Sequence, residues 1–335
     1  MIQRVSVLVT FYNQEKYVDL ALKSIVNQKT DFGIKVLIGD DGSTDKTRDL
    51  VAKWIDRYPG MIELYVTERT PEEHMASFRA SRNRLNLLNH VNTEYFIFLD
   101  GDDYYTYEEK LQKQVAILDN PDNSDCIACG HNIDLLYPDG MRIPTTSARI
   151  KEGKYGPKEY WGSLYFHTNT ILARSSVIPT IDRKLLENNF DDNLITFMLI
   201  QQGYLYYIPE SWAVYLQTGD GLWTGERAVI NHIRSMFTYD LCIQINPGMM
   251  KETTRTCSGA WKSLLKIRNR INSAELKFLS EEAKDKNMMN AYNWIHYREL
   301  SLAGKQALCI KAFSICWKQI IRGILSRICR TILKF

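Results

Sequence analysis

Three carboxylates crowd into four residues at Asp100, Asp102 and Asp103, directly after the apolar run Phe96–Leu99. Like charges this close together raise the cost of ionising one another. A bound divalent cation removes that cost, and Mg²⁺ and Mn²⁺ prefer oxygen ligands while keeping positions open for phosphate oxygens. We therefore predict a metal site at Asp100, Asp102 and Asp103, with a solvated acidic turn as the alternative.

A second acidic segment, Asp40–Asp45, follows the apolar residues Val36–Ile38. A carboxylate at Asp41 can accept a hydrogen bond from the imide N–H of uracil, a group that cytosine lacks. The alternative is local, because Asp40 and Ser43 can also build an Asx turn and a cap for the next helix. We interpret Asp41 as a base-binding residue and keep the turn as the alternative.

Four short apolar runs alternate with helical stretches in the first hundred residues. The predicted strands are Val5–Val9, Val36–Ile38, Ile62–Val66 and Tyr95–Leu99, and helical periodicity lies between them. This alternation favours parallel pairing in a doubly wound sheet. Because parallel strands end at one edge, the two acidic segments are expected to converge there, where such sheets bind ligands. Further along, residues 126–143 read as a hairpin with a turn at Pro138–Gly140.

Length and composition restrict the class of protein. The 335 residues suffice for one large domain with an extension, and the apolar and charged fractions, 45% and 24%, are those of a folded soluble protein. The seven cysteines are scattered and odd in number, which suits a reducing compartment such as the cytoplasm. Neither a Gly-x-x-x-x-Gly-Lys loop nor a Gly-x-Gly-x-x-Gly turn occurs, which argues against P-loop and dinucleotide-binding enzymes.

The motifs follow one another in a recognisable order. They are Val5–Asn13 followed by Glu15, then Ile38–Asp45, Ser81–Asn83, and Leu99–Asp103 followed by Lys110–Gln114. This succession resembles the family 2 glycosyltransferases. The resemblance implies an α/β fold of the GT-A type over residues 1–225, with a Rossmann-like, mostly parallel sheet flanked by helices. Residues 226–304 are helix-rich and polar, so we expect a C-terminal helical extension there, with a break at Asn246–Gly248.

The resemblance also implies roles for individual residues on the donor side. It places around the nucleotide sugar the residues Thr10, Tyr12, Asn13, Glu15, Asp41, Arg82 and Asp102. It implies Mg²⁺ or Mn²⁺ as the cofactor, held by Asp100, Asp102 and Asp103 and holding the diphosphate in turn. Arg82 has a simpler interpretation as a surface charge on a helix.

An acidic pair, Asp191 and Asp192, precedes an apolar segment that runs to Gly203. Family members carry an acidic pair at this interval before a glycine. The resemblance thus implies that Asp192 is the base that takes the proton from the acceptor hydroxyl, with Asp191 supporting it. The alternative is that both acids merely favour a helix N-terminus, and the two interpretations are compatible. His167 and Trp223 are candidate acceptor contacts, and His167 can equally be a structural histidine.

The function implied is inverting transfer of one sugar from a UDP-sugar to the hydroxyl of a glycan or lipid-linked acceptor, in surface polysaccharide or glycan synthesis. A single addition is expected because the Gln-x-x-Arg-Trp motif of processive relatives is missing. A sugar-nucleotide pyrophosphorylase is one alternative, although it should carry a basic loop near the first strand. The second alternative is a non-catalytic glycan-binding protein, which the presence of all the candidate acidic residues disfavours.

The last residues differ in charge from the rest of the chain. Residues 305–335 carry seven Lys and Arg and no acid, so that subtracting +7 from the total of +3 leaves −4 for residues 1–304. Ile310, Phe313, Trp317 and Ile321 recur at helical spacing on one face. We expect either a helix that packs on the domain or peripheral contact with an anionic membrane at its cytoplasmic face. Large aliphatic residues outnumber what phosphate binding needs, so no nucleic-acid partner is expected.

Overall fold

The computed structural model describes residues 1–69, 76–146, 149–163, 166–187, 190–219, 228–250 and 252–253. The chain divides into two compact units, Met1–Gly225 and Glu226–Phe335. The basic tail over residues 305–335, for which we predicted an amphipathic helix, lies outside the described residues.

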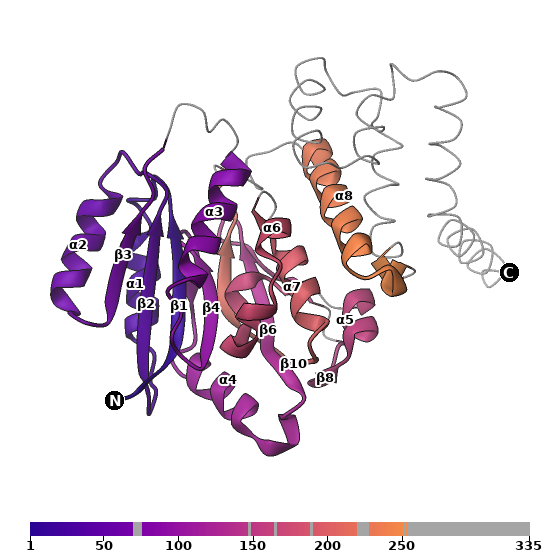
Figure 1. Ribbon diagram of the computed structural model, residues 1–335. Coiled ribbons are helices and arrows are strands. Elements are labelled where there is room, and N and C mark those ends of the chain that lie inside the picture. The colour runs from indigo at the N-terminus through magenta and orange to yellow at the C-terminus, as the bar shows by residue number, and fades with distance from the viewer. Residues whose placement is uncertain are drawn as a thin grey trace, which may run out of the picture. The chain divides into compact units, whose positions relative to one another are not determined.

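The first unit is built on a ten-stranded sheet with helices packed against it (Figure 1). Its first half contains β1 (Gln3–Phe11), β2 (Gly33–Asp40), β3 (Ile62–Val66) and β4 (Tyr95–Asp100), all parallel, in the spatial order β3-β2-β1-β4. They alternate along the chain with α1 (Val18–Val26), α2 (Thr47–Arg57) and α3 (Ala76–Leu88). The α/β fold predicted from the apolar runs is thus confirmed.

The sheet continues from β4 in the order β9-β6-β10-β5. Two further strands lie off this order, since β7 pairs with β6 and β8 pairs with β10. The strands of this half are β5 (Tyr104–Tyr105), β6 (Cys126–Leu136), β7 (Arg142–Pro144), β8 (Gly153–Tyr155), β9 (Leu172–Arg174) and β10 (Tyr204–Leu216). The pair β6 and β10 is parallel, but β9 runs antiparallel to both β4 and β6, so that the sheet is mixed beyond β4. The antiparallel pair β6 and β7 forms the hairpin predicted over residues 126–143.

Four helices and three 3₁₀ turns belong to this second half. They are α4 (Lys110–Asp119), α5 (Pro157–Ser163), α6 (Arg183–Leu186), α7 (Asp192–Ile200), η1 (Pro121–Asn123), η2 (Thr168–Thr170) and η3 (Ser175–Thr180). In Figure 1, α3, α6 and α7 lie on the same side of the sheet. The start of α7, the turn η2 and the end of β4 are the elements that carry the acidic groups discussed below.

The core explains why the strands read as continuous apolar runs. Val5, Val7 and Val9 of β1 are completely buried and pack in one cluster with Leu22 and Ile25 of α1. Burying an aliphatic side chain of this size contributes roughly 1.5–3 kcal/mol. Since parallel strands covered on both faces have few solvent-facing positions, polar residues gather where the strands end, and the buried Ser6 and Lys35 are exceptions.

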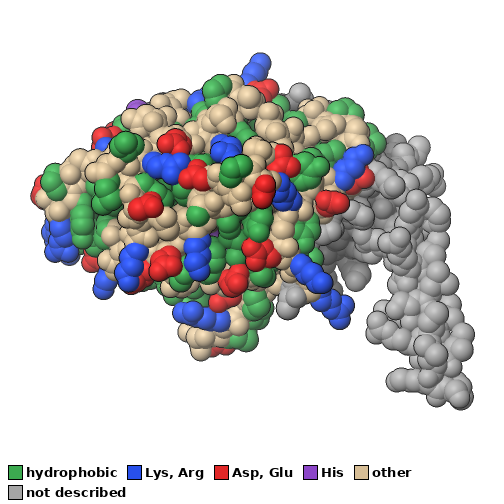
Figure 2. All heavy atoms as spheres, turned by 90° about the horizontal axis from the view of Figure 1, so that it is seen from below, with side chains coloured by type: hydrophobic (Ala, Val, Ile, Leu, Met, Phe, Trp, Pro, Cys, Tyr) green, Lys and Arg blue, Asp and Glu red, His purple; other side chains and the backbone are tan. Residues whose placement is uncertain are grey.

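The second unit begins with α8 (Ala228–Ile245), which ends one residue before the predicted break and is followed by η4 (Pro247–Met249). Within the described parts of the chain, no helix has the length and apolar character needed to cross a membrane. On the face shown in Figure 2, acidic and basic side chains lie interspersed among apolar ones.

Candidate active site

The polar segments predicted to converge do meet at the carboxyl ends of the central strands. The register pairs Thr10 of β1 with Asp100 of β4, and Phe11 of β1 with Asp40 of β2. The hydroxyl of Thr10 donates to Asp100 over 3.2 Å. One strand-end residue therefore already contacts the acidic loop that follows β4.

Asn13 and Glu15, both predicted to bind the donor, join the loop after β1 to the loop after β2. The side-chain oxygen of Asn13 accepts from the Thr44 N–H over 2.8 Å, and Glu15 accepts from the Lys46 N–H over 3.0 Å. Asn13 has a φ of 50°, a left-handed conformation that Asn tolerates better than most residues. Both residues hold the shape of the donor-side loops, whatever further contacts they make.

The helix cap suggested for Ser43 does not form. The helix α2 begins at Thr47, and its N-cap residue Lys46 makes no side-chain cap. The Ser43 hydroxyl instead accepts from the Asn13 N–H over 2.9 Å, and the backbone N–H of Ser43 donates to the Asp40 carboxylate over 2.8 Å. Asp40 and Ser43 therefore contact each other locally, but over three residues rather than the two of an Asx turn, and the Ser43 hydroxyl joins the two loops.

Asp41 is buried and surrounded by arginines that the sequence analysis did not single out. Its carboxylate accepts from Arg69 over 2.6 Å and lies 3.6 Å from the Nε atom of Arg79. Burial raises the pKa of Asp41, although the two guanidinium groups act in the opposite direction. The Arg69 guanidinium also lies 3.2 Å from the centre of the Tyr12 ring, so it bridges the two residues predicted to hold the base.

The acidic loop after β4 requires its glycine. A Cβ atom at Gly101 would lie 2.2 Å from a ring carbon of Phe11. Without that obstruction the chain turns sharply, and the Asp103 N–H donates to the Asp100 carbonyl over 2.9 Å. Asp103 is completely buried, and its carboxylate accepts from the Leu216 N–H and from the Asn169 side chain, each over 3.0 Å.

The three acids of this loop differ in their electrostatics. Burial acts to raise the pKa of Asp100, but the adjacent Arg84 guanidinium, together with His167 and the Thr10 hydroxyl, outweighs it and lowers the pKa. Burial and then the Asp100 charge raise the pKa of Asp102 to about 6. Burial and its two acidic neighbours raise the pKa of Asp103 well above the ordinary range. The carboxylates of this loop therefore repel one another, as predicted from the sequence, and a bound cation would reduce this repulsion.

Asp102 gives this repulsion a measurable pH dependence. Its pKa is 3.8 in the unfolded chain and about 6 in the folded one, so the folded state binds the extra proton and stability falls as pH rises through this interval. In the presence of a chelator, we expect Asp102→Asn to be about 1–2 kcal/mol more stable than wild type at pH 7.5. The difference should shrink as the pH falls through 6 and approach zero only below the unfolded pKa of 3.8, as read from thermal or urea unfolding. A difference that stays constant over this range contradicts the expectation.

A group competent to hold a metal ion consists of Asp100, Asp103 and His167, each offering a ligand atom within 4.8 Å of the others. The Nδ1 atom of His167 is buried and has no hydrogen-bond partner among the described residues, which suits a nitrogen that holds another partner. Two carboxylates suit Mn²⁺ or Mg²⁺, and the imidazole, which is a ligand of transition metals, favours Mn²⁺ of the two. This donor set fits the predicted cofactor, with two differences: His167, predicted as an acceptor contact, joins the group, and Asp102 is not a member of it.

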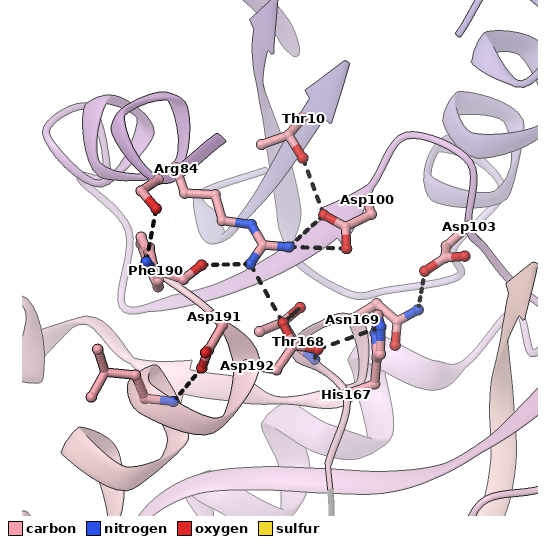
Figure 3. A network of polar contacts seen from close by, with 12 residues as sticks. Thr10, Arg84, Asp100, Asp103, His167, Thr168, Asn169, Phe190, Asp191 and Asp192 are labelled. Carbon is pink, nitrogen blue, oxygen red and sulfur yellow. Dashed lines mark hydrogen bonds and ion pairs between the residues drawn. The ribbon is translucent and has the colours of Figure 1, made fainter. Parts of the chain in front are cut away.

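The two acids at the start of α7, Asp191 and Asp192, make different contacts. Asp191 is the N-cap, and its carboxylate accepts from the Leu194 N–H over 2.8 Å. Asp192 instead accepts from the Thr168 hydroxyl over 3.2 Å and lies 3.4 Å from Nε2 of His167 (Figure 3). The helix-start interpretation therefore describes Asp191, while Asp192 lies in the same polar network as the metal-competent group.

The arginine in this network is Arg84, two residues after the one that was predicted. Arg84 donates to Asp100 over 2.7 Å and lies 3.4 Å from Asp192. Arg82 is exposed and lines a shallow surface depression with Arg183 and Asn89, away from the network. Trp223 lies outside the described residues.

A sequence profile described as "Glycosyl transferase family 2" matches residues 6–181, which is more than half of the chain. The chain belongs to glycosyltransferase family 2. An uncharacterized protein of Mycobacterium tuberculosis is 28% identical to this chain over 227 residues, which make up 65% of this chain and 60% of the relative. TarS of Staphylococcus aureus, a poly(ribitol-phosphate) β-N-acetylglucosaminyltransferase, is 33% identical over 117 residues, or 34% of this chain and 18% of TarS.

Solved structures share the fold of this chain. TarS 1–349 in complex with UDP superposes with a TM-score of 0.61 at 16% identity, covering 88% of this chain and 80% of that one. The mannosyltransferase PcManGT of Pyrobaculum calidifontis, in complex with GDP-Man and Mn²⁺, gives 0.52 at 16% identity, covering 93% and 88%. These likenesses confirm the predicted GT-A type of fold.

Proposed function

We propose that this glycosyltransferase moves one sugar, with inversion, from a UDP-sugar to an acceptor hydroxyl with the help of Mg²⁺ or Mn²⁺. The observation that carries the proposal is the contact between His167 and Asp192. It joins the metal-competent group, through one imidazole, to a carboxylate suited to act as a base. A donor diphosphate and an attacking hydroxyl would thus be handled by neighbouring groups, as displacement at the anomeric carbon requires.

On the donor side, Asp41 would accept the imide N–H of uracil while the ring of Tyr12 offers a face for stacking. The interlocked loops around Asn13 and Ser43 hold these groups in place before a nucleotide arrives. Asp100, Asp103 and His167 would hold the cation, which neutralises the negative charge that grows on the leaving diphosphate.

On the acceptor side, the Asp192 carboxylate would take the proton from the attacking hydroxyl. The Thr168 hydroxyl and the Arg84 guanidinium contact one of its oxygens, and His167 lies near the other. These contacts restrict the rotation of the carboxylate, so that little reorganisation is needed when the proton is transferred.

The acceptor we propose is a surface polysaccharide or a lipid-linked glycan. TarS, by its name, acts on poly(ribitol-phosphate), which supports a polymeric acceptor of this class. A cytoplasmic location, with peripheral membrane contact through residues 305–335, stays a prediction.

A panel of UDP-, GDP- and CDP-sugars, each incubated with the full chain and Mn²⁺ or Mg²⁺, tests the proposal. We expect release of UDP from one of the UDP-sugars, first to water and faster with glycan acceptors. Consumption of UTP with a sugar 1-phosphate would instead identify a pyrophosphorylase. Binding of glycans without turnover of any donor would identify a binding module.

The selection of uracil over other nucleobases gives a separate prediction at Asp41. Loss of a charged hydrogen bond weakens binding by about 1.5–3 kcal/mol, so Asp41→Asn should bind UDP about tenfold or more weakly by isothermal titration with metal present. An asparagine amide can donate to cytosine as well as accept from uracil, so the preference for UDP over CDP should shrink. GDP belongs in the same titration, since guanine also presents N–H groups to a carboxylate. The matched control is Asp49→Asn, an exposed acid on α2, which should bind like wild type. Equal affinity of wild type for UDP and CDP contradicts the assignment.

A further inference from the structure

Arg84 joins two carboxylates that come from distant parts of the chain. One terminal nitrogen donates to both oxygens of Asp100, over 2.7 and 3.0 Å. The other donates to the Phe190 carbonyl over 3.0 Å and lies 3.4 Å from Asp192 (Figure 3). The same guanidinium therefore contacts the metal-competent group, the segment leading into α7, and the carboxylate proposed as the base.

The surroundings fix this guanidinium tightly. The Arg84 side chain is only 12% exposed, and its Cζ atom lies 5.9 Å from the ring centres of both Phe98 and Phe190. Phe190 is itself held, because its N–H donates to the buried Ser81 hydroxyl over 2.8 Å. Ser81 and Arg84 both belong to α3, so that this helix anchors the residue before Asp191 at two points.

A planar guanidinium is needed for these contacts. Its two terminal nitrogens point in fixed, divergent directions and can serve two carboxylates at once, whereas a lysine ammonium is a single point charge. Asp192 stands at the first residue of α7, and Asp100 at the last residue of β4. The separation and relative orientation of these two elements are thus set in part by one side chain.

We propose that Arg84 is a positioning residue for sugar transfer, which sets the base Asp192 in register with the donor-holding carboxylates. The inference rests on the proposed function, because it assigns Arg84 a role through Asp192. Misplacing a reacting group by about 1 Å can cost about 10²-fold in rate, which is the scale of effect expected here. A purely structural ion pair would change stability and leave the proton-transfer geometry unchanged.

The test compares Arg84→Met and Arg84→Lys with the control Arg57→Met, which changes an exposed arginine on α2. The measurements are kcat and KM for UDP release from the active UDP-sugar, Kd for UDP by titration with metal, and thermal stability. We expect Arg84→Met to lower kcat about 10²-fold while Kd for UDP changes less than about threefold. Arg84→Lys should recover only part of the rate, and Arg57→Met should match wild type.

A double-mutant cycle separates positioning from structure. If Arg84 acts through Asp192, then adding Arg84→Met to Asp192→Asn should not lower the single-turnover rate of UDP release any further. Multiplicative losses, or a wild-type kcat in Arg84→Met, overturn the proposal. Should Arg84→Met fail to fold, Arg84→Lys decides, since a kcat at least tenfold lower at unchanged Kd supports it and an unchanged kcat refutes it. If the wild-type chain releases UDP from no donor, the proposed function fails, and the role of Arg84 falls with it.

Discussion

Replacing Asp192 with asparagine is expected to lower kcat for UDP release by about 10³-fold and to leave the affinity for UDP within about threefold of wild type. The amide cannot take the proton of the attacking hydroxyl, and general base catalysis contributes roughly 10²–10⁴-fold. The fold should persist, because asparagine is nearly isosteric and the Thr168 hydroxyl and Arg84 keep an oxygen to contact. Steady-state turnover and isothermal titration of the same preparation give both numbers.

The neighbouring residue supplies the matched control. Asp191→Asn keeps the N-cap of α7, since asparagine caps a helix about as well as aspartate. It should retain most of the activity and a melting temperature close to that of wild type. The assignment of the base is wrong if Asp191→Asn is inactive while Asp192→Asn turns over normally.

Removal of the metal, by chelation or by Asp103→Asn, is expected to have the other large effect. Chelation should lower UDP affinity and turnover by about 10²-fold or more, because the cation contributes several kcal/mol of charge stabilisation. Mn²⁺ or Mg²⁺ added back should restore both in wild type. In Asp103→Asn neither ion should restore them, because the buried carboxylate of the metal-competent group is gone.

The same variant should be at least as stable as wild type when no metal is present. Its carboxylate is buried beside two others, and neutralising it removes that repulsion. The new amide can still accept from the Leu216 N–H, and the Asn169 amide, whose oxygen has no partner, can rotate to accept from it. Asp122→Asn, an exposed position in η1, is the control for loss of an acid elsewhere. A strongly destabilised Asp103→Asn, or one that binds UDP as wild type does with metal, would contradict this account.

The sequence could predict those parts of the site whose residues lie close together along the chain. Apolar runs located β1, β2 and β4, and acids at their ends marked the edge where they meet, because strand direction alone brings those ends together. The acidic pair before α7 was found from the family resemblance, because the interval from the pair to Gly203 also lies within one segment.

The parts that sequence could not predict depend on partners far along the chain. Arg79, Arg82 and Arg84 all lie on α3, and the residue that enters the site is selected by Asp100 and Asp192, which come from other elements. His167 was predicted only as an acceptor contact, because its own segment carries no sign that the turn after it, η2, lies beside the acidic loop. The strand β9 has only three residues, too few for a periodic pattern, yet it decides that the sheet becomes mixed.

The position of Arg69 has a consequence for how fast a nucleotide leaves. Its guanidinium lies on the Tyr12 ring and on the Asp41 carboxylate, which we propose as the surfaces that a uracil base uses. An incoming base competes with a side chain tethered beside it, which is present at a high effective concentration. If the ring is free for only about a tenth of the time, the measured Kd is about tenfold weaker than the intrinsic one. The same competitor returns as spent UDP loosens, so the arrangement works against product inhibition and favours repeated turnover over tight retention of the nucleotide.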